Sequence, residues 1–292
     1  MKVAITGAGG RLGRAVARVL GEHGHDVAAW TRQDLDVTNT GAVQSALEAA
    51  RPAWVVNCAA LTNVDRCETD KQGALNVNAT AVAALGMMAE SVEARLCHVS
   101  TDYVFGGEPE RAPWREADEP GPVNHYGRTK LLGEEVASRC IGALIVRVAL
   151  VYGDKELPSF VEKVFERVRA GGEIQTATDM VGSPSYAPEV ARATVMLVEA
   201  GREGVWHVAG AGGASRHELA SVAAEALKPG SSSLIRAVSS GELGLPALRP
   251  KDSTLDVTKL EREGGFSLKP WQETVKAWAA AWAGAGKAAA PS

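Results

Sequence analysis

A tyrosine and a lysine four residues apart are the side chains of this sequence best suited to acid–base chemistry. Tyr126 and Lys130 lie in the segment NHYGRTKLLGEE, which predicts a helix that begins near Tyr126. Residues four apart on a helix share one face, so the phenol and the ammonium are expected side by side. A neighbouring cation favours the phenolate and lowers the pKa of a tyrosine, which can then exchange a proton near neutral pH. This pair suits the reduction of a ketone, although Tyr-x-x-x-Lys alone is common in helices.

Three glycines after the first apolar run provide a second chemical feature. Gly7, Gly10 and Gly13 stand in GAGGRLG, at the expected junction of a strand and a helix. Glycines let the backbone turn tightly and approach a pyrophosphate, whose charge meets the free N–H groups of the helix N-terminus. The spacing is Gly-x-x-Gly-x-x-Gly rather than Gly-x-Gly-x-x-Gly, but its place in the chain predicts a dinucleotide site. Arg11 and Leu12, between the last two glycines, belong to the same predicted site.

The tip of the second predicted strand indicates which dinucleotide is preferred. That strand ends at Trp30, Thr31 and Arg32, with no carboxylate at the tip. A site specific for NAD places an acidic residue about 20 positions after the glycines, where it binds the ribose 2′-hydroxyl. Arg32 can instead pair with a 2′-phosphate, so NADP(H) is the expected cofactor and use of NAD(H) stays open. Asp36 and Val37 follow where an adenine would lie. The alternative is that Arg32 is only a solvated turn residue.

Alternating apolar runs and helical patterns predict the frame that positions these residues. The segments KVAITG, HDVAAW, WVVNCAA and ARLCHVS have the pattern of parallel strands joined by crossover helices, one of them over residues 74–89. ALIVRVALVYG is apolar on both faces and predicts a buried central strand. The expected fold is therefore α/β: a doubly wound parallel (Rossmann) sheet with a smaller C-terminal α/β lobe, which would bind substrate beside the carboxyl ends of the strands.

The change of rhythm after Gly153 predicts where the two parts of the chain divide. We expect residues 1–152 to form the dinucleotide-binding domain, with 187–209 returning to it. Residues 153–186 and 210–283 would form the substrate lobe, in which Ser215 and Glu218 make a capping box before a helix. The small and polar end of the chain, 284–292, is expected to be a flexible tail.

Composition and charge exclude several classes of protein. The 292 residues are 46% apolar and 23% charged, as in a globular chain with a large core. A net charge of −4, with scattered lysines and arginines, predicts no nucleic-acid partner. No uncharged apolar run reaches about 18 residues, which predicts no membrane span. The chain begins directly with a strand pattern in place of a secretion signal, so a cytoplasmic location is expected.

The cysteines and histidines do not follow a metal-binding pattern. None stands in CxxC or HExxH, so buried reduced thiols and structural or surface histidines, not clustered with carboxylates, are expected. The sequence therefore predicts no metal site. The residues concerned are Cys58, Cys67, Cys97, Cys140, His23, His25, His98, His125, His207 and His217.

Further segments give the chain a resemblance to a known family. Besides the glycine loop and YGRTK, it contains DLDVTN, NCAALTNVDRCE, NVNATAV, STDYVFGG, RVALVYG, GSPSYAPEVA and RPKDSTLD, in this order. Together they resemble the extended short-chain dehydrogenases and, among them, the dTDP-4-dehydrorhamnose reductase family along almost the whole chain. The resemblance implies NADPH-dependent reduction of the 4-keto group of a nucleotide-activated deoxysugar, with dTDP-4-dehydrorhamnose as the expected substrate and dTDP-rhamnose as the product. It leaves a homodimer open.

The resemblance also implies roles for single residues. Tyr126 would donate the proton, Lys130 would hold the nicotinamide ribose and lower the pKa of the tyrosine, and Thr101 would tune both. Asp102 and Tyr103 would contact the sugar. Thr101 alone would otherwise be interpreted as a hydroxyl cap at the end of a strand. The segment beneath the nicotinamide would consist of Ala59, Ala60, Leu61 and Thr62. Arg249 would lie near the pyrophosphate of the substrate, and the alternative is that it is only a surface charge.

Two departures from the family pattern limit what the resemblance implies. Leu150 stands where the family usually has a tryptophan that packs on the deoxysugar, so the substrate contact at this position differs. Ala15 stands where some members have a glutamate that joins a magnesium site between subunits. That metal is therefore not expected here.

Two other functions are compatible with the same motifs. An epimerase or dehydratase of the same superfamily would regenerate its cofactor in each cycle, but dehydratases of this type tend to place an Asp-Glu pair after the threonine, whereas Thr101 is followed by Asp102 and Tyr103. A non-catalytic, NADP-binding regulatory subunit is the other alternative. The intact Thr101, Tyr126 and Lys130 argue against it.

Overall fold

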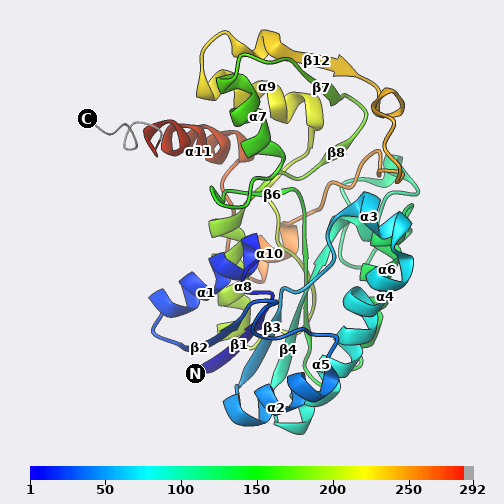
Figure 1. Ribbon diagram of the computed structural model, residues 1–292, viewed down its shortest axis with the longest axis vertical. Helices are drawn as coiled ribbons and strands as arrows, with labels where there is room; N and C mark the ends of the chain where they lie inside the picture. The colour runs from blue at the N-terminus through cyan, green and yellow to red at the C-terminus, as the bar shows by residue number, and fades with distance from the viewer. Residues whose placement is uncertain (286–292) are drawn as a thin grey trace.

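A six-stranded parallel sheet is the centre of the structure, a computed structural model that describes residues 1–285 (Figure 1). The strand order is β10-β5-β4-β3-β1-β2, and every neighbouring pair is parallel. This confirms the predicted α/β fold with a doubly wound sheet. The strands are β1 (Lys2–Thr6), β2 (Asp26–Trp30), β3 (Trp54–Asn57), β4 (Arg95–Thr101), β5 (Leu144–Val148) and β10 (Gly204–His207).

Helices cover both faces of this sheet because its strands carry apolar side chains on both sides. On one face α1 and α8 pack over Val3 and Ile5, and on the other α2, α5 and α6 pack over Ala4 and Val55. Parallel strands joined in this way bring their carboxyl ends to one edge, where the substrate lobe lies in Figure 1. The helices are α1 (Arg11–Glu22), α2 (Thr40–Ala50), α3 (Val64–Thr69), α4 (Lys71–Leu75), α5 (Ala81–Ser91), α6 (His125–Ala137), α8 (Ala187–Glu199) and α10 (Thr258–Arg262).

A second hydrophobic core holds the smaller lobe together. Val164, Ala220 and Val275 are buried between α7 (Phe160–Arg169), α9 (Arg216–Leu227) and α11 (Trp271–Ala285). The predicted capping box is confirmed, because Ser215 Oγ accepts from the Glu218 N–H and Glu218 accepts from the Ser215 N–H. Short strand pairs complete the lobe: β7 (Ile174–Ala177) with β12 (Ile235–Val238), β8 (Val181–Gly182) with β11 (Ala214–Ser215), and β6 (Val151–Tyr152) with β9 (Ser185–Tyr186).

Two predicted elements are interrupted in the structure. The expected strand over ALIVRVALVYG ends at Val148, and Leu150 adopts a positive φ of 43° before β6 joins a different sheet. The expected helix over 74–89 contains a π-helical turn, η1 (Asn76–Thr80), between α4 and α5. The break at Leu150 is missed because the sequence stays apolar through it, and the π-helical turn is missed because Asn76–Thr80 contains no proline or glycine that would mark an interruption. Each interruption lies beside the candidate site.

Other expectations concern the chain as a whole. β10 joins the large sheet beside β5, while the division of the chain into domains stays a prediction. The predicted tail 284–292 starts within α11 and otherwise lies outside the described residues. All four cysteines are free, as expected. Within residues 1–285 no helix has the length and apolar character needed to cross a membrane.

Candidate active site

The glycine loop turns so tightly that side chains are excluded from two of its positions. Gly7 has a φ of +69°, and a Cβ there would lie 2.5 Å from the backbone nitrogen of Ala59. A Cβ on Gly13 would overlap the carbonyl oxygen of Gly7. Gly10, the N-cap of α1, gives the helix no side-chain cap, so its first N–H groups face the loop without that partner. The loop therefore has the close backbone approach and the positive helix end that a pyrophosphate needs.

The first of three cavities along the carboxyl edge, here named the glycine-loop cavity, has a volume of about 470 Å³. Arg32 and Asp36 line it. The carboxylate of Asp34 accepts bonds from the N–H and hydroxyl of Thr31, at 2.9 and 2.6 Å, and is not among the lining residues. A carboxylate therefore does lie near the strand tip, contrary to expectation, but it does not line the cavity. The lining residues are Gly7, Gly9, Gly10, Thr31, Arg32, Gln33, Leu35, Asp36, Val37, Thr38, Cys58, Ala59, Ala60, Leu61 and Val77.

A second cavity, the tyrosine cavity, continues from the first and has a volume of about 320 Å³. Gly10, Cys58 and Ala60 line both cavities, so the two are contiguous. The tyrosine cavity brings together predicted residues from five separate segments of the chain. Its lining residues are Gly10, Arg11, Leu12, Gly13, Cys58, Ala60, Thr62, Val99, Ser100, Thr101, Asp102, Tyr126, Lys130, Val148, Leu150 and Val151.

Burial decides the protonation state of Tyr126. Burial raises the pKa of its phenol well above the ordinary value, and the negative charge of Asp102 acts in the same direction, while the Thr101 hydroxyl beside it lowers the pKa. The expected fall in the pKa of Tyr126 is therefore not produced by the side chains of this chain alone. The phenol is protonated at neutral pH, which is the form that can donate a proton.

Lys130 is held from behind by the end of β4. Its Nζ donates to the carbonyl oxygen of Val99 at 2.7 Å and lies 3.3 Å from Nε2 of His98. Burial lowers the pKa of Lys130 to about 8, although Glu134 acts in the opposite direction. The side chain is 1% exposed, so its ammonium has few partners besides those in the cavity.

A buried chain of hydrogen bonds positions that lysine, and sequence reasoning missed it. Asn57 Oδ1 accepts from the Thr6 hydroxyl at 2.7 Å and from the Ala59 N–H at 3.1 Å. The Asn57 amide group must then donate to Nδ1 of His98, 3.1 Å away, which leaves the His98 proton on Nε2. An N–H directed at Lys130 disfavours its ammonium form, in the same direction as burial. The signals in the sequence were the position of His98 in a strand next to the site and of Asn57 at the start of the segment NCAALTNVDRCE.

The turn after β4 links the two parts of the molecule. The carboxylate of Asp102 accepts from the hydroxyls of Thr101 at 2.9 Å and Ser253 at 2.6 Å, the latter from the C-terminal part of the chain. Burial raises the pKa of Asp102 to about 6, and these two bonds limit the rise. Tyr103 packs edge to face on Tyr126, with 5.9 Å between ring centres. Ser253 was not predicted, since no local pattern ties it to Asp102.

The π-helical turn η1 carries Asn78, which connects two segments of the site. Asn78 is fully buried, and its side chain accepts from the Leu61 N–H at 2.8 Å and donates to the Leu61 carbonyl at 3.2 Å. It also donates to the Thr129 hydroxyl at 3.1 Å. Asn78 therefore ties the segment Ala59 to Thr62 to the helix that carries Tyr126.

Leu150 lies where the tyrosine cavity meets the substrate lobe. It also lines a third, narrow space of about 10 Å³, the lobe cavity. Arg216 lines this space and provides a positive charge there. The sequence analysis missed it because it directly follows the N-cap Ser215 and is typical of the first residue of a helix. The lobe cavity is lined by Tyr103, Leu150, Met180, Val181, Gly182, Arg216, Pro250 and Ser253.

Arg249 lies apart from the lining residues of these three cavities. Its guanidinium donates to both carboxylate oxygens of Asp65, at 3.0 and 2.9 Å, and to the carbonyl of Ala247 at 2.7 Å. The bond from Arg249 lowers the pKa of Asp65. A contact of Arg249 with a substrate pyrophosphate stays a prediction, since the guanidinium would have to bind the pyrophosphate in addition to the Asp65 carboxylate.

Two buried polar atoms at the tyrosine cavity have no partner within residues 1–285. They are Nε of Arg11 and the hydroxyl oxygen of Ser100. Buried polar groups are normally hydrogen-bonded, and an exception at a cavity indicates a missing ligand or water. Another nitrogen of Arg11, Nη2, donates to the Leu157 carbonyl at 2.6 Å.

The fold and this arrangement together define an oxidoreductase of the extended short-chain dehydrogenase class. A family model described as the RmlD substrate binding domain matches residues 1–283. The dTDP-4-dehydrorhamnose reductase of Mycolicibacterium smegmatis is 37% identical over 286 residues, which cover 97% of this chain and 86% of the relative. The chain therefore belongs to the dTDP-4-dehydrorhamnose reductase family.

Solved structures agree with this assignment. A crystal structure of a dTDP-4-dehydrorhamnose reductase from Clostridium acetobutylicum has a TM-score of 0.90 and 34% identity, with 97% of this chain and 99% of the other covered. The dTDP-4-dehydrorhamnose reductase of Bacillus anthracis, solved in complex with NADP, has a TM-score of 0.88 and 30% identity, with 95% and 98% covered. The resemblance inferred from the sequence motifs is thus confirmed.

Proposed function

We propose that this protein catalyses the NADPH-dependent reduction of dTDP-4-dehydrorhamnose to dTDP-rhamnose. The observation that carries the proposal is the tyrosine cavity, in which the glycine loop, Thr101, Tyr126 and Lys130 line one space of about 320 Å³. Relatives named for this reaction support the choice of substrate. The cytoplasmic location and the homodimer stay predictions.

The residues that line the contiguous cavities fit a nicotinamide dinucleotide phosphate. The glycine loop can make its tight turn only because Gly7 and Gly13 lack a Cβ, and backbone N–H groups in such a turn can bind a pyrophosphate. Arg32 lines the glycine-loop cavity, and no ion-pair partner for it is found in the described part of the chain, so its guanidinium is available to a 2′-phosphate. When bound, the reduced nicotinamide supplies the hydride for the reaction.

Tyr126 is the proton donor in this proposal. Its phenol is protonated at neutral pH, so it can give its proton to the oxygen of the 4-keto group as negative charge develops there. The Lys130 ammonium stabilises the phenolate that remains, and the Thr101 hydroxyl does so once its proton turns from the Asp102 carboxylate to the phenolate oxygen. Because the pKa of Lys130 is about 8, the lysine is charged over most of the neutral range.

The substrate has to enter from the side of the lobe. Leu150 presents an apolar side chain to the tyrosine cavity, next to Asp102 and Tyr103 of the turn after β4. Arg216 provides a cation close to this space and is a candidate partner for the phosphates of the nucleotide. The Asp102 carboxylate, fixed by Ser253, holds the turn in place.

Activity with freshly prepared dTDP-4-dehydrorhamnose tests the proposal. NADPH oxidation should match the formation of dTDP-rhamnose mole for mole, and its C3/C5 epimer, dTDP-4-keto-6-deoxyglucose, should react more slowly. A product formed without net NADPH oxidation would instead indicate an epimerase. NADPH binding with no turnover of any 4-keto-6-deoxy nucleotide-sugar would indicate the regulatory subunit.

A further inference from the structure

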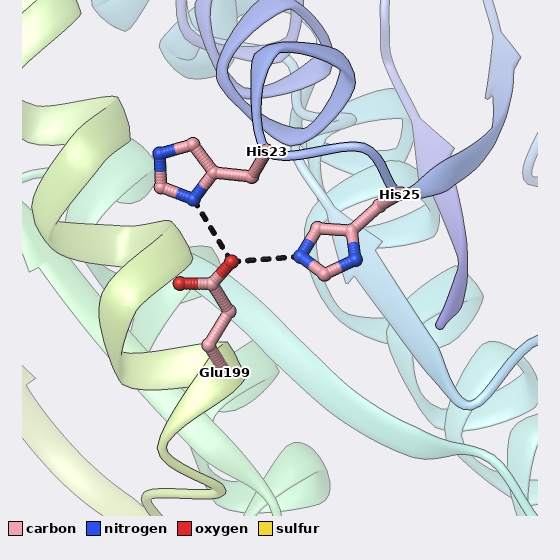
Figure 2. A group of neighbouring side chains, drawn as sticks. All are labelled: His23, His25 and Glu199. Atoms are coloured by element: carbon pink, nitrogen blue, oxygen red, sulfur yellow. Dashed lines mark hydrogen bonds and ion pairs between the residues drawn. The ribbon is translucent and has the colours of Figure 1, made fainter.

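Two histidines and a glutamate converge where α1 and α8 end, near the amino end of β2 (Figure 2). Nδ1 of His23 and Nε2 of His25 lie 2.9 and 2.7 Å from the same oxygen, Oε1 of Glu199. The three ligand atoms all lie within 4.8 Å of one another. The expectation that no histidine clusters with a carboxylate is therefore wrong, because residues 174 and 176 positions apart meet here.

The backbone holds the two histidines in this arrangement. His23 is the C-cap of α1, and Gly24 takes a φ of +75° so that the His25 N–H can bond the Leu20 carbonyl at 3.0 Å. This turn places the imidazoles on the same side, with ring centres 6.5 Å apart. Nδ1 of His25 lies 3.2 Å from the Met1 nitrogen, so Nε2 is the nitrogen that reaches Glu199.

Two features of the surroundings favour a cation at this point. Both α1 and α8 end here, and the carbonyl ends of helices carry partial negative charge. The Glu199 carboxylate also lies within hydrogen-bonding distance of both imidazoles, at 2.9 and 2.7 Å, so its negative charge faces the same point. His23 supplies a lone pair to a metal once its proton moves to Nε2, and His25 does so once its proton moves to Nδ1 and the Met1 ammonium turns away from that nitrogen.

We propose that His23, His25 and Glu199 form a binding site for a divalent transition-metal ion of the zinc class, distinct from the active site. Zinc is commonly held by two histidines and one carboxylate at about 2.0–2.2 Å, which requires ligand atoms about 3.3 Å apart. The two short separations must open by about half an ångström, and the side chains of His23 and Glu199, 40% and 30% exposed, have room to move. The fourth position remains for water.

The ion would fasten α1 to α8, two helices that cover the same face of the sheet. Its expected effect is on stability, since the site lies at the amino end of β2 while the tyrosine cavity lies at the carboxyl ends of the strands. Turnover is therefore expected to survive removal of the ion with EDTA. This inference does not rest on the proposed function.

Zinc titration of untagged, EDTA-dialysed protein tests the site. Calorimetry should give one Zn²⁺ per chain with a micromolar or tighter Kd, and saturating Zn²⁺ should raise the Tm by several degrees. His23→Gln and Glu199→Gln should each weaken binding at least about tenfold. His217→Gln is the matched control and should bind as the wild type does, because His217 lies on α9 and its Nδ1 is 3.1 Å from the hydroxyl of Thr176 in β7.

Spectroscopy keeps the test decisive if a variant loses stability. Co²⁺ bound to the wild-type site should give visible absorption bands typical of nitrogen and oxygen ligands in a four-coordinate site, and His23→Gln, at the exposed ligand, should lose them. Absence of one-site binding, or variants that bind Zn²⁺ within twofold of the wild type, would overturn the proposal. The cluster would then be a hydrogen-bonded network only.

Discussion

The glycine-loop cavity and the lobe cavity are built from the chain in different ways. Residues 7–77 alone line the former, and they come from the ends of successive strands and the loops that follow them. The latter is lined by residues from 103 to 253, which arrive from the turn after β4, the break at Leu150, and the starts of β8 and α9. Local sequence therefore specifies the dinucleotide half, while the substrate half depends on contacts between distant segments.

Among substitutions that test this difference between the two cavities, the largest effect is expected from one in the glycine loop. Gly13→Val puts a side chain into the Gly7 carbonyl, so NADPH affinity and folding stability together should fall by at least about 3 kcal/mol. Fluorescence titration with NADPH and urea unfolding measure the two parts. Gly21→Ala, in the same helix with no atom within 4 Å of its new Cβ, should instead gain about 0.5–1 kcal/mol.

The contact of Asp102 with Ser253, which links the turn after β4 to the C-terminal part of the chain, can be tested through the pH dependence of the unfolding free energy. Because the folded pKa of Asp102, about 6, exceeds the unfolded value of 3.8, the folded state binds this proton more tightly and loses stability as pH rises from about 4 to 6. Asp102→Asn removes that loss, so its unfolding free energy relative to wild type should increase by about 1–3 kcal/mol between pH 4.5 and 7. Ser253→Ala, which removes a bond that lowers the pKa, should steepen the loss. Equal slopes in all three proteins would refute this account of Asp102.

Arg32 tests how strictly the dinucleotide half selects its ligand. Arg32→Ala should reduce the ratio of kcat/KM for NADPH over NADH by about 5- to 150-fold, equivalent to about 1–3 kcal/mol, since a charge-assisted contact is lost. Values with NADH should stay nearly constant. Gln33→Ala, at the next position of the same cavity, is the control and should leave the ratio within about twofold. An unchanged ratio in Arg32→Ala would mean that Arg32 is a solvated turn residue.

The smallest effect is expected in the substrate half. Leu150→Ala removes apolar contact area worth about 1–2 kcal/mol, so the KM for the sugar nucleotide should rise about 5- to 30-fold. The Kd for NADPH should change less than twofold. Leu248→Ala, an exposed leucine of the C-terminal part, should change neither constant. A larger change in NADPH affinity than in sugar KM would assign Leu150 to the dinucleotide half.

The same contrast explains what the sequence could predict. Strand and helix patterns placed Gly7, Arg32 and Tyr126 correctly at one edge, because parallel strands joined by helices leave no other arrangement. The links from Asn57 through His98 to Lys130 could not be predicted, since they depend on register between β3 and β4. Family likeness supplied the role of Thr101, which spacing alone would not.

The substrate half escaped sequence reasoning for a related reason. Leu150 could be placed by family likeness, but its positive φ arises where β5 ends and β6 pairs with β9 in another sheet. Arg216 reaches the site from a segment with no motif, and Ser253 lies in the segment RPKDSTLD, which does not reveal that its hydroxyl contacts Asp102. Asn78 reaches the site through a π-helical turn that no periodicity reveals.

Tyr126 offers the most direct test of the central claim that this cavity reduces a ketone by proton donation from its tyrosine. Tyr126→Phe removes only one oxygen, so NADPH should bind with a Kd within about threefold of the wild type. Its kcat for dTDP-4-dehydrorhamnose should fall by about 10²–10⁴, the usual contribution of a general acid. Deuterated NADPH establishes whether hydride transfer limits the rate. If Tyr126→Phe keeps more than roughly a third of wild-type kcat while that transfer is rate-limiting, Tyr126 is not the acid.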